Sequence, residues 1–153
     1  MLSYEQFYNW YNNFFYFSNS NTINTNIAMN NLIIEESIKT PSVAFAAESG
    51  ILELKGKSIP ENSLEFYRPV FEWIDNYGQS PNSSTELKVR LEYFNTSSSK
   101  CLLDVFRRLE TLSLSGKSTV KVSWYYDGDD EDMMEAGEDY SALVKIPFEL
   151  LKA

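Results

Sequence analysis

The residues of this chain that are best placed to do chemistry form a short row of hydroxyls. The stretch YFNTSSSKC, residues 93–101, sets an asparagine, a threonine and three serines side by side. Alternating apolar and polar residues lead into this row, and apolar residues at helical spacing follow it. The sequence therefore predicts that the hydroxyls lie at a turn between a strand and a helix.

Such a row has a structural and a functional explanation. Asn, Thr and Ser are the preferred N-cap residues of helices, so one residue of the row will cap the helix that begins at about Ser97. One cap is enough, and the other hydroxyls stand where backbone amides and the helix dipole favour an anion. A phosphate there would add about −1.5 to −2 charge. Both explanations are kept, a plain helix cap and a phosphorylation site.

Other residues that could do chemistry match known sites poorly. The chain has no histidine, which excludes Ser-His-Asp and Cys-His catalysis and removes the commonest zinc ligand. Cys101, in the first turn of the helix, is interpreted as a buried structural cysteine. Residues 116–118, Gly-Lys-Ser, lack the upstream glycine of a phosphate-binding loop and are interpreted as a turn. No catalytic residue is predicted.

An acidic run at residues 127–139 holds eight carboxylates and no basic residue. A calcium loop of the EF-hand type requires a glycine at its sixth position, but counting from Asp127 that position is Asp132. The run is interpreted as a solvated acidic helix, with a docking surface for a basic partner as the second interpretation. We predict no metal and no cofactor, and keep a small acidic metal-dependent enzyme that uses this cluster as the alternative function.

Composition narrows the class of partner. A net charge of −9 argues against binding to nucleic acid or to an anionic membrane surface, since both favour a basic face. A single cysteine allows no internal disulfide and fits a reducing compartment, so a cytoplasmic location is expected. The length of 153 residues is enough for one domain.

Residues 1–28 differ from the rest. They carry one charged residue, Glu5, and seven asparagines, and nine aromatic side chains crowd between Tyr4 and Phe17. They fit neither a secretory signal nor a membrane span. Three interpretations remain: a disordered tail, upstream sequence translated in error ahead of a start at Met29, or an aromatic helix that docks on a partner. The domain itself is placed at residues 29–153.

Hydrophobic periodicity predicts the elements of this domain. Strands are expected at residues 42–46, 51–55, 86–93, 119–126 and 142–148, and helices from residue 62 or 63 to 77, from about residue 97, and around residues 133–136. Gly50 is expected at the turn of a hairpin formed by the first two strands. Pro69 marks either a kink in the first helix or a junction between two helices.

The order of the elements predicts the sheet. A strand, a helix and a strand in succession give two parallel strands. In the first of them, Leu87, Val89, Leu91 and Tyr93 are expected on one side. Because both strands alternate, one face of the sheet should be covered by helices and the other left open. The predicted fold class is α/β, a single-layer mixed sheet with helices packed mainly on one face, in the order β-β-α-β-α-β-α-β.

From about Thr40 onward the chain resembles the SiaC family of bacterial regulatory phosphoproteins. The matching segments, in order, are TPSVAF, GILELKGKSIPENSLEFYRPVFEWI, LEYFNTSSSKCLLDVFRRLE, VSWYYDGDDEDMMEAGEDYS and KIPFELL. They cover nearly all of the domain. The resemblance implies a STAS-like fold, related to the domains of anti-sigma-factor antagonists, which agrees with a one-sided sheet.

The resemblance also implies a function in partner switching. A serine/threonine kinase with a histidine-kinase-like ATPase domain would phosphorylate the protein, and a PPM-type serine/threonine phosphatase would reverse this. The unphosphorylated form would bind and activate a diguanylate cyclase, which makes cyclic di-GMP and promotes aggregation or biofilm. The protein itself would not be an enzyme.

For the hydroxyl row, the resemblance implies that Thr96 is the phosphoacceptor, with Ser97 and Ser98 as rivals. The partner-binding residues that it implies are Asn95, Thr96, Ser97, Ser98, Ser99 and Lys100. The two explanations of the row are then compatible, since a capped helix start would also act as a switch.

Overall fold

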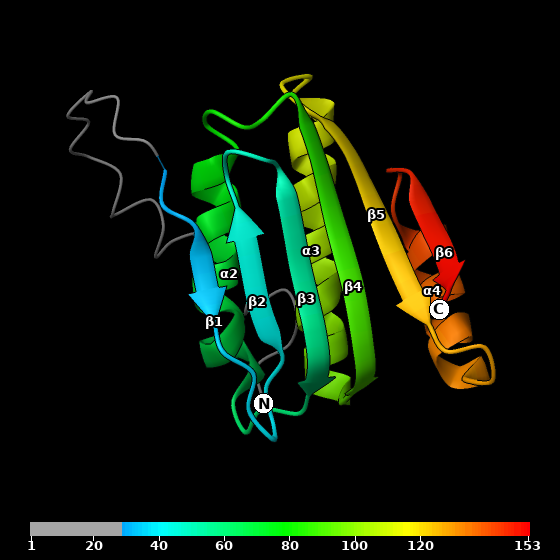
Figure 1. Cartoon of the computed structure of the whole chain (residues 1–153). Coiled ribbons are helices and arrows are strands. Elements are labelled where there is room, and N and C mark those ends of the chain that lie inside the picture. The colour runs from blue at the N-terminus through cyan, green and yellow to red at the C-terminus, as the bar shows by residue number, and fades with distance from the viewer. Residues whose placement is uncertain (1–28) are drawn as a thin grey trace.

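The computed structural model describes residues 29–153, so the interpretations of residues 1–28 lie outside the described residues. Its elements are β1 (Leu32–Ile34), β2 (Ser42–Ala46), β3 (Ile51–Ser58), α2 (Ser63–Tyr77), β4 (Ser84–Phe94), α3 (Thr96–Leu114), β5 (Thr119–Tyr126), α4 (Glu131–Leu143) and β6 (Phe148–Lys152). Figure 1 shows the strands in one sheet, with the three labelled helices together on one face of it.

The six strands form a mixed sheet in the order β1-β2-β3-β4-β5-β6. β1, β2 and β3 pair antiparallel, whereas β3, β4, β5 and β6 are parallel to one another, as predicted for β4 and β5. The parallel strands therefore end on the same side of the sheet, and α2, α3 and α4 begin there (Figure 1). We call this side, with the ends of β3, β4 and β5 and the starts of the three helices, the carboxyl edge.

The prediction of a one-sided sheet is confirmed. On β4, Leu87 and Val89 are fully buried against the helices, whereas Lys88 and Arg90 reach solvent on the opposite face. The core fills the space between the sheet and the helices. Its largest fully buried side chains include Trp124, Tyr67, Tyr77, Phe45, Phe71 and Phe106.

The predicted hairpin and first helix are both present. Gly50 lies in the turn between β2 and β3 with φ of 71°, and a Cβ there would lie 2.0 Å from the Ser84 carbonyl oxygen, so only glycine fits. α2 is a single helix that continues through Pro69, so the two-helix alternative is wrong. Its N-cap is Asn62, whose side-chain oxygen accepts a hydrogen bond from the Glu65 amide at 3.1 Å.

Both ends of the sheet differ from the prediction. β1 was not predicted, because three residues are too few to show an alternating pattern. The final strand predicted at residues 142–148 is wrong, since α4 runs to Leu143 and β6 begins only at Phe148. The intervening Val144 and Ile146 are buried, which gave the segment its strand-like pattern. Pro147 has no amide hydrogen to donate to a ladder, so pairing with β5 starts at its carbonyl.

The expected side of Tyr93 is also wrong, because a β-bulge interrupts β4. The pairing of β3 with β4 shifts register between Gly56 and Lys57, so that Gly56 lies opposite Leu91 but Lys57 lies opposite Tyr93. An extra residue in one strand reverses the side to which the following side chains point. Tyr93 is therefore 58% exposed. Phe94 points inward instead.

Candidate functional site

The hydroxyl row lies at the carboxyl edge, where β4 turns into α3. Asn95 is the N-cap of α3: its Oδ1 accepts a hydrogen bond from the Ser98 amide at 2.9 Å. The Asn95 amide in turn donates to the carbonyl of Ser58 at the end of β3, at 3.0 Å. The predicted strand-to-helix turn is confirmed. The cap is the asparagine, and Thr96 is the first residue of the helix.

The Ser98 hydroxyl belongs to the interior. The residue is fully buried, and its Oγ accepts a hydrogen bond from Ser58 Oγ at 2.8 Å. Ser58 Oγ also shares a hydrogen bond of 2.7 Å with Tyr67 Oη. Burial raises the pKa of Tyr67 well above its usual value, so this phenol remains protonated at neutral pH. The three hydroxyls together satisfy one another beneath the start of α3.

The Ser97 hydroxyl connects the starts of two helices. It donates to Asn95 Oδ1 at 3.0 Å and shares a hydrogen bond of 2.7 Å with Ser63 Oγ, on the first residue of α2. The start of α2 is thereby fastened beside the start of α3. The Ser99 hydroxyl is also occupied, since it donates to the Thr96 carbonyl at 2.6 Å.

Thr96 stands apart from the other hydroxyls of the row. It is exposed, and within residues 29–153 its hydroxyl makes no hydrogen bond. As the first residue of α3, it lies where amides and the helix dipole favour a negative group. Lys100 lies one turn further along the helix, is exposed, and forms no ion pair within the described part of the chain. The arrangement leaves a single free hydroxyl at the helix start.

Two titratable side chains that pack beneath the row, Tyr140 and Cys101, are neutral at neutral pH. Tyr140 of α4 donates a hydrogen bond to the Ser99 carbonyl at 2.9 Å, and burial raises its pKa far above the usual value. Cys101 is buried, as predicted, and burial together with the nearby Asp104 carboxylate raises the pKa of its thiol to about 12. Neither side chain supplies a base or a thiolate nucleophile at neutral pH.

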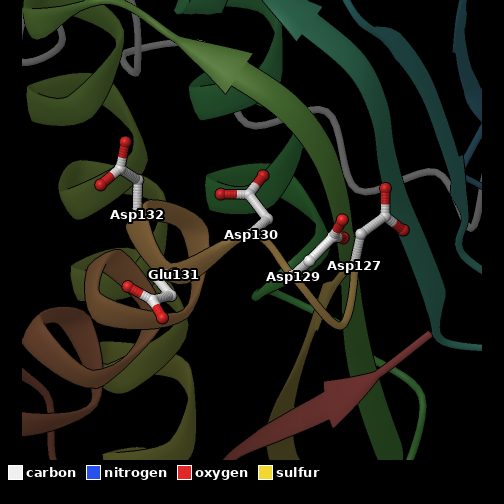
Figure 2. Close-up of a pocket in the computed structure, with 5 residues that line it drawn as sticks. All are labelled: Asp127, Asp129, Asp130, Glu131 and Asp132. Carbon is white, nitrogen blue, oxygen red and sulfur yellow. The ribbon is translucent and has the colours of Figure 1, made fainter.

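The acidic run lies between β5 and α4 and continues into that helix. Figure 2 shows that the carboxylates of Asp127, Asp129, Asp130, Glu131 and Asp132 line a pocket without converging on one point. Asp130 caps α4 by accepting a hydrogen bond from the Met133 amide at 3.0 Å. Among residues 29–153 no group of three or more side chains is arranged to hold a metal ion. This geometry gives no support to the alternative of a metal-dependent enzyme.

No helix in the described part of the chain is long and apolar enough to cross a membrane.

A mixed sheet with its helices on one face is also the fold of known proteins that this chain resembles. A family model described as SiaC family regulatory phosphoprotein matches residues 34–153. The chain belongs to the SiaC family.

Its relatives include one protein known from sequence and several solved structures. An uncharacterized protein of Pseudomonas aeruginosa strain UCBPP-PA14 is 32% identical over 120 residues, which cover 78% of this chain and 94% of that protein. The structure of SiaC of Pseudomonas aeruginosa is 30% identical, with a TM-score of 0.75, and covers 82% of this chain and 100% of its own.

A second structure shows the relative with a partner. It is the crystal structure of the diguanylate cyclase SiaD in complex with its activator SiaC from Pseudomonas aeruginosa. That SiaC chain is 31% identical to the present chain, with a TM-score of 0.75, and the match covers 80% of this chain and 99% of that one.

Proposed function

We propose that this chain is a non-enzymatic binding module that binds and activates a diguanylate cyclase, and that phosphorylation of Thr96 switches the activation off. The observation that carries the proposal is the free, exposed hydroxyl of Thr96 at the start of α3. Membership of a family of regulatory phosphoproteins supports the switch. The relative that is described as the activator of a diguanylate cyclase supports the output.

Two further partners complete the proposed switch. A serine/threonine kinase with a histidine-kinase-like ATPase domain would add the phosphate, and a PPM-type serine/threonine phosphatase would remove it. The product of the activated cyclase, cyclic di-GMP, would promote aggregation or biofilm. We propose a cytoplasmic location, where the kinase would find ATP and the cyclase would find its nucleotide substrate.

The state of the neighbouring hydroxyls favours Thr96 over its rivals. Ser98 is fully buried, so a kinase would reach it only if the start of α3 unfolded. Phosphorylation of Ser97 would disrupt the hydrogen bonds that join α2 to α3. Phosphorylation of Thr96 requires neither change, because its hydroxyl is exposed and has no hydrogen bond within the described residues.

The expected effect of the phosphate falls on binding rather than on the fold. A dianion at the start of an exposed helix is stabilising by roughly 0.3–1 kcal/mol. On a docking surface, however, the same dianion must lose its water, and without a cation opposite it this costs several kcal/mol. Each 1.4 kcal/mol is about a tenfold change in affinity. A desolvation cost of this size at Thr96 would therefore be enough to release the cyclase.

The test is a binding titration of the organism's diguanylate cyclase with the full chain, alongside phosphopeptide mapping after incubation with the kinase. Thr96→Ala should bind the cyclase and accept no phosphate, whereas Thr96→Asp should bind at least tenfold more weakly. Thr119→Asp is the matched control, because this exposed threonine is the first residue of β5 and therefore lies at the end of the strand that is away from the carboxyl edge. Equal affinities for the alanine and aspartate variants of Thr96, or phosphate mapped elsewhere, would refute the assignment.

A further inference from the structure

The open face of the sheet, opposite the three helices in Figure 1, carries a concentration of basic residues. On β3, β4 and β5 this side presents five of the chain's 13 lysine and arginine residues but only three of its 22 aspartate and glutamate residues. The basic residues are Lys55, Lys57, Lys88, Arg90 and Lys121, and the acidic residues are Glu53, Glu86 and Glu92. This region is therefore positive in a chain whose net charge is −9.

Two of the three carboxylates on this side are already neutralised. Glu86 and Glu92 each form an ion pair of 3.6 Å, with Lys121 and Lys57 respectively. Glu53 is the third carboxylate, and no ion pair within residues 29–153 involves it. Within the same residues three cations are also left without an ion pair, and these are Lys55, Lys88 and Arg90.

The pairing of the strands places these three cations together. Lys55 of β3 lies directly opposite Arg90 of β4, and Lys88 is two residues before Arg90, on the same side of the strand. The Arg90 guanidinium lies over the ring of Tyr125 on β5, 3.7 Å from its centroid. Glu149 of β6 also faces this side but lies two strands away from Lys88. We call Lys55, Lys88, Arg90 and Tyr125 the basic face.

The shape of the basic face fits a protein surface. Its side chains stand on three neighbouring strands of an open sheet, whereas small molecules usually bind in concave pockets. The net charge of −9 disfavours nucleic acid. A guanidinium that is fixed by stacking on a ring presents its N–H groups to a planar carboxylate. The complement of the basic face is therefore an acidic segment of a protein.

The chain itself supplies an acidic segment of this kind. The acidic run begins with Asp127, two residues after Tyr125, and seven of its eight carboxylates are exposed. Within residues 29–153 none of them forms an ion pair. The basic face and the acidic run thus lie next to each other at the end of β5. A two-fold axis between them would bring the basic face of each copy against the acidic run of the other.

We propose that the basic face is the contact of a two-fold dimer, in which it receives the acidic run of a second copy. Closed two-fold dimers are the commonest protein oligomers, and each makes the same contact twice. The net charge of each copy opposes association at long range, but salt at physiological concentration screens charges that are more than about 8 Å apart. The proposal does not involve Thr96 and is independent of the proposed function.

The test is sedimentation equilibrium of the full chain at concentrations up to about 1 mM, so that even a millimolar dissociation constant is detected. We expect a reversible dimer. Arg90→Glu and Asp129→Lys should each weaken it at least tenfold, because like charges would then face each other in both contacts. The matched controls are Arg68→Glu, on the exposed side of α2, and Glu48→Lys, in the turn between β2 and β3. They change the net charge equally and should leave the dimer nearly unchanged.

A mixture of the two reversed variants gives the sharpest check. In an equimolar mixture of Arg90→Glu and Asp129→Lys, the new carboxylate of one variant would face the new ammonium of the other. The unchanged Arg90 and Asp129 would form the second contact. The mixture should therefore recover most of the wild-type affinity, which a misfolded variant could not do.

Four results would overturn the proposal. The first is a chain that stays monomeric up to about 1 mM. The second is a dimer that neither reversal weakens, and the third is a dimer that the controls weaken equally. The fourth is a mixture that remains monomeric although each reversal alone breaks the dimer. If the chain is monomeric but binds a synthetic peptide of residues 127–139, and Arg90→Glu abolishes this, the occupant is an acidic segment of a different protein.

Discussion

Two neighbouring residues should have different roles: Asn95 should contribute to the stability of the fold, and Thr96 should carry the phosphate. Asn95 Oδ1 accepts two hydrogen bonds at the start of α3, one from the Ser98 amide at 2.9 Å and one from the Ser97 hydroxyl at 3.0 Å. The Thr96 hydroxyl makes none within residues 29–153. We therefore expect Asn95→Ala to lower the free energy of unfolding and Thr96→Ala to leave it nearly unchanged.

The size of the difference follows from these contacts. Replacing an asparagine N-cap by alanine costs about 1 kcal/mol, within a range of roughly 0.5–2. The cost at Asn95 should lie in the upper half of that range, because the amide that loses its partner belongs to the buried Ser98. Thr96→Ala replaces an exposed side chain by the best helix former, so its effect should stay within about 0.5 kcal/mol.

The assay is urea unfolding of the full chain, followed by circular dichroism, with phosphate incorporation measured on the same samples. For Asn95→Ala we expect a loss of about 1–2 kcal/mol, near 3–8 °C in melting temperature, with Thr96 still phosphorylated. For Thr96→Ala we expect wild-type stability and no phosphate. Asn95→Asp is the rescue control, since an aspartate also accepts both hydrogen bonds and should restore stability.

The reasoning would be refuted if Thr96→Ala lost more than about 1 kcal/mol, because an N-cap contribution of that size would then belong to Thr96. It would equally fail if Asn95→Ala had wild-type stability. In that case the hydrogen bonds of Asn95 would contribute nothing measurable to the helix start.

Two further predictions concern the core beneath the site. Cys101 should resist iodoacetamide in the folded protein up to pH 9 and react fully once guanidinium has unfolded it. In the folded protein the thiol is buried and has a pKa of about 12, so it forms almost no thiolate at pH 9. Rapid labelling of the native protein would contradict this. Gly137→Ala should destabilise the protein by about 1–3 kcal/mol in urea unfolding, although alanine favours helices, since a Cβ would lie 2.6 Å from Trp124 Cδ1. Ala136→Gly is the control for helix propensity, and a variant Gly137→Ala that is more stable than the wild type would contradict the predicted clash with Trp124.

The layers of the fold could be predicted from the sequence, because the spacing of apolar residues shows which face of a strand or helix is buried. The alternation in β4 and β5 predicted one covered face and one open face, and β4 follows it as far as Leu91. β5 follows it as far as Val122, but Ser123 is fully buried on the other face, where its hydroxyl donates a hydrogen bond to Glu86. The start of α3 could be predicted for a similar reason. A row of capping residues between a strand pattern and a helix pattern leaves few other places for the helix to begin.

The sequence was insufficient where a contact with another strand decides the outcome. Nothing within β4 indicates that the register with β3 shifts beyond Gly56, so the alternation seemed to continue through Tyr93. The adjacent aromatic, Phe94, was the available signal, because two neighbouring aromatic residues cannot both face the core of a regular strand. The exposure of Ile38 could not be predicted for the same reason, since the position of its turn depends on the hydrogen bond between the Ile59 amide and the Lys39 carbonyl.

Which hydroxyl of the row is free also depends on distant residues. By type alone, Thr96, Ser97 and Ser98 are equivalent candidates for a kinase. Their difference arises because Ser58 at the end of β3 and Ser63 at the start of α2 engage the two serines. These partners lie more than thirty residues away in the chain, at separations of 40 and 34 positions. No local pattern could have ranked the hydroxyls.

The bulge in β4 decides which aromatic side chain at the end of this strand is buried and which is exposed near Thr96. By reversing the sides of its last residues, it turns Phe94 inward against Trp124 and Tyr140, with ring centroids 6.1 and 6.3 Å apart, and turns Tyr93 out to solvent. The inward ring packs the end of β4, directly before the N-cap of α3, against the core. The outward ring of Tyr93 is exposed three residues before Thr96. A phosphate on Thr96 would then change the surface that a partner meets while the helix beneath it remained in place.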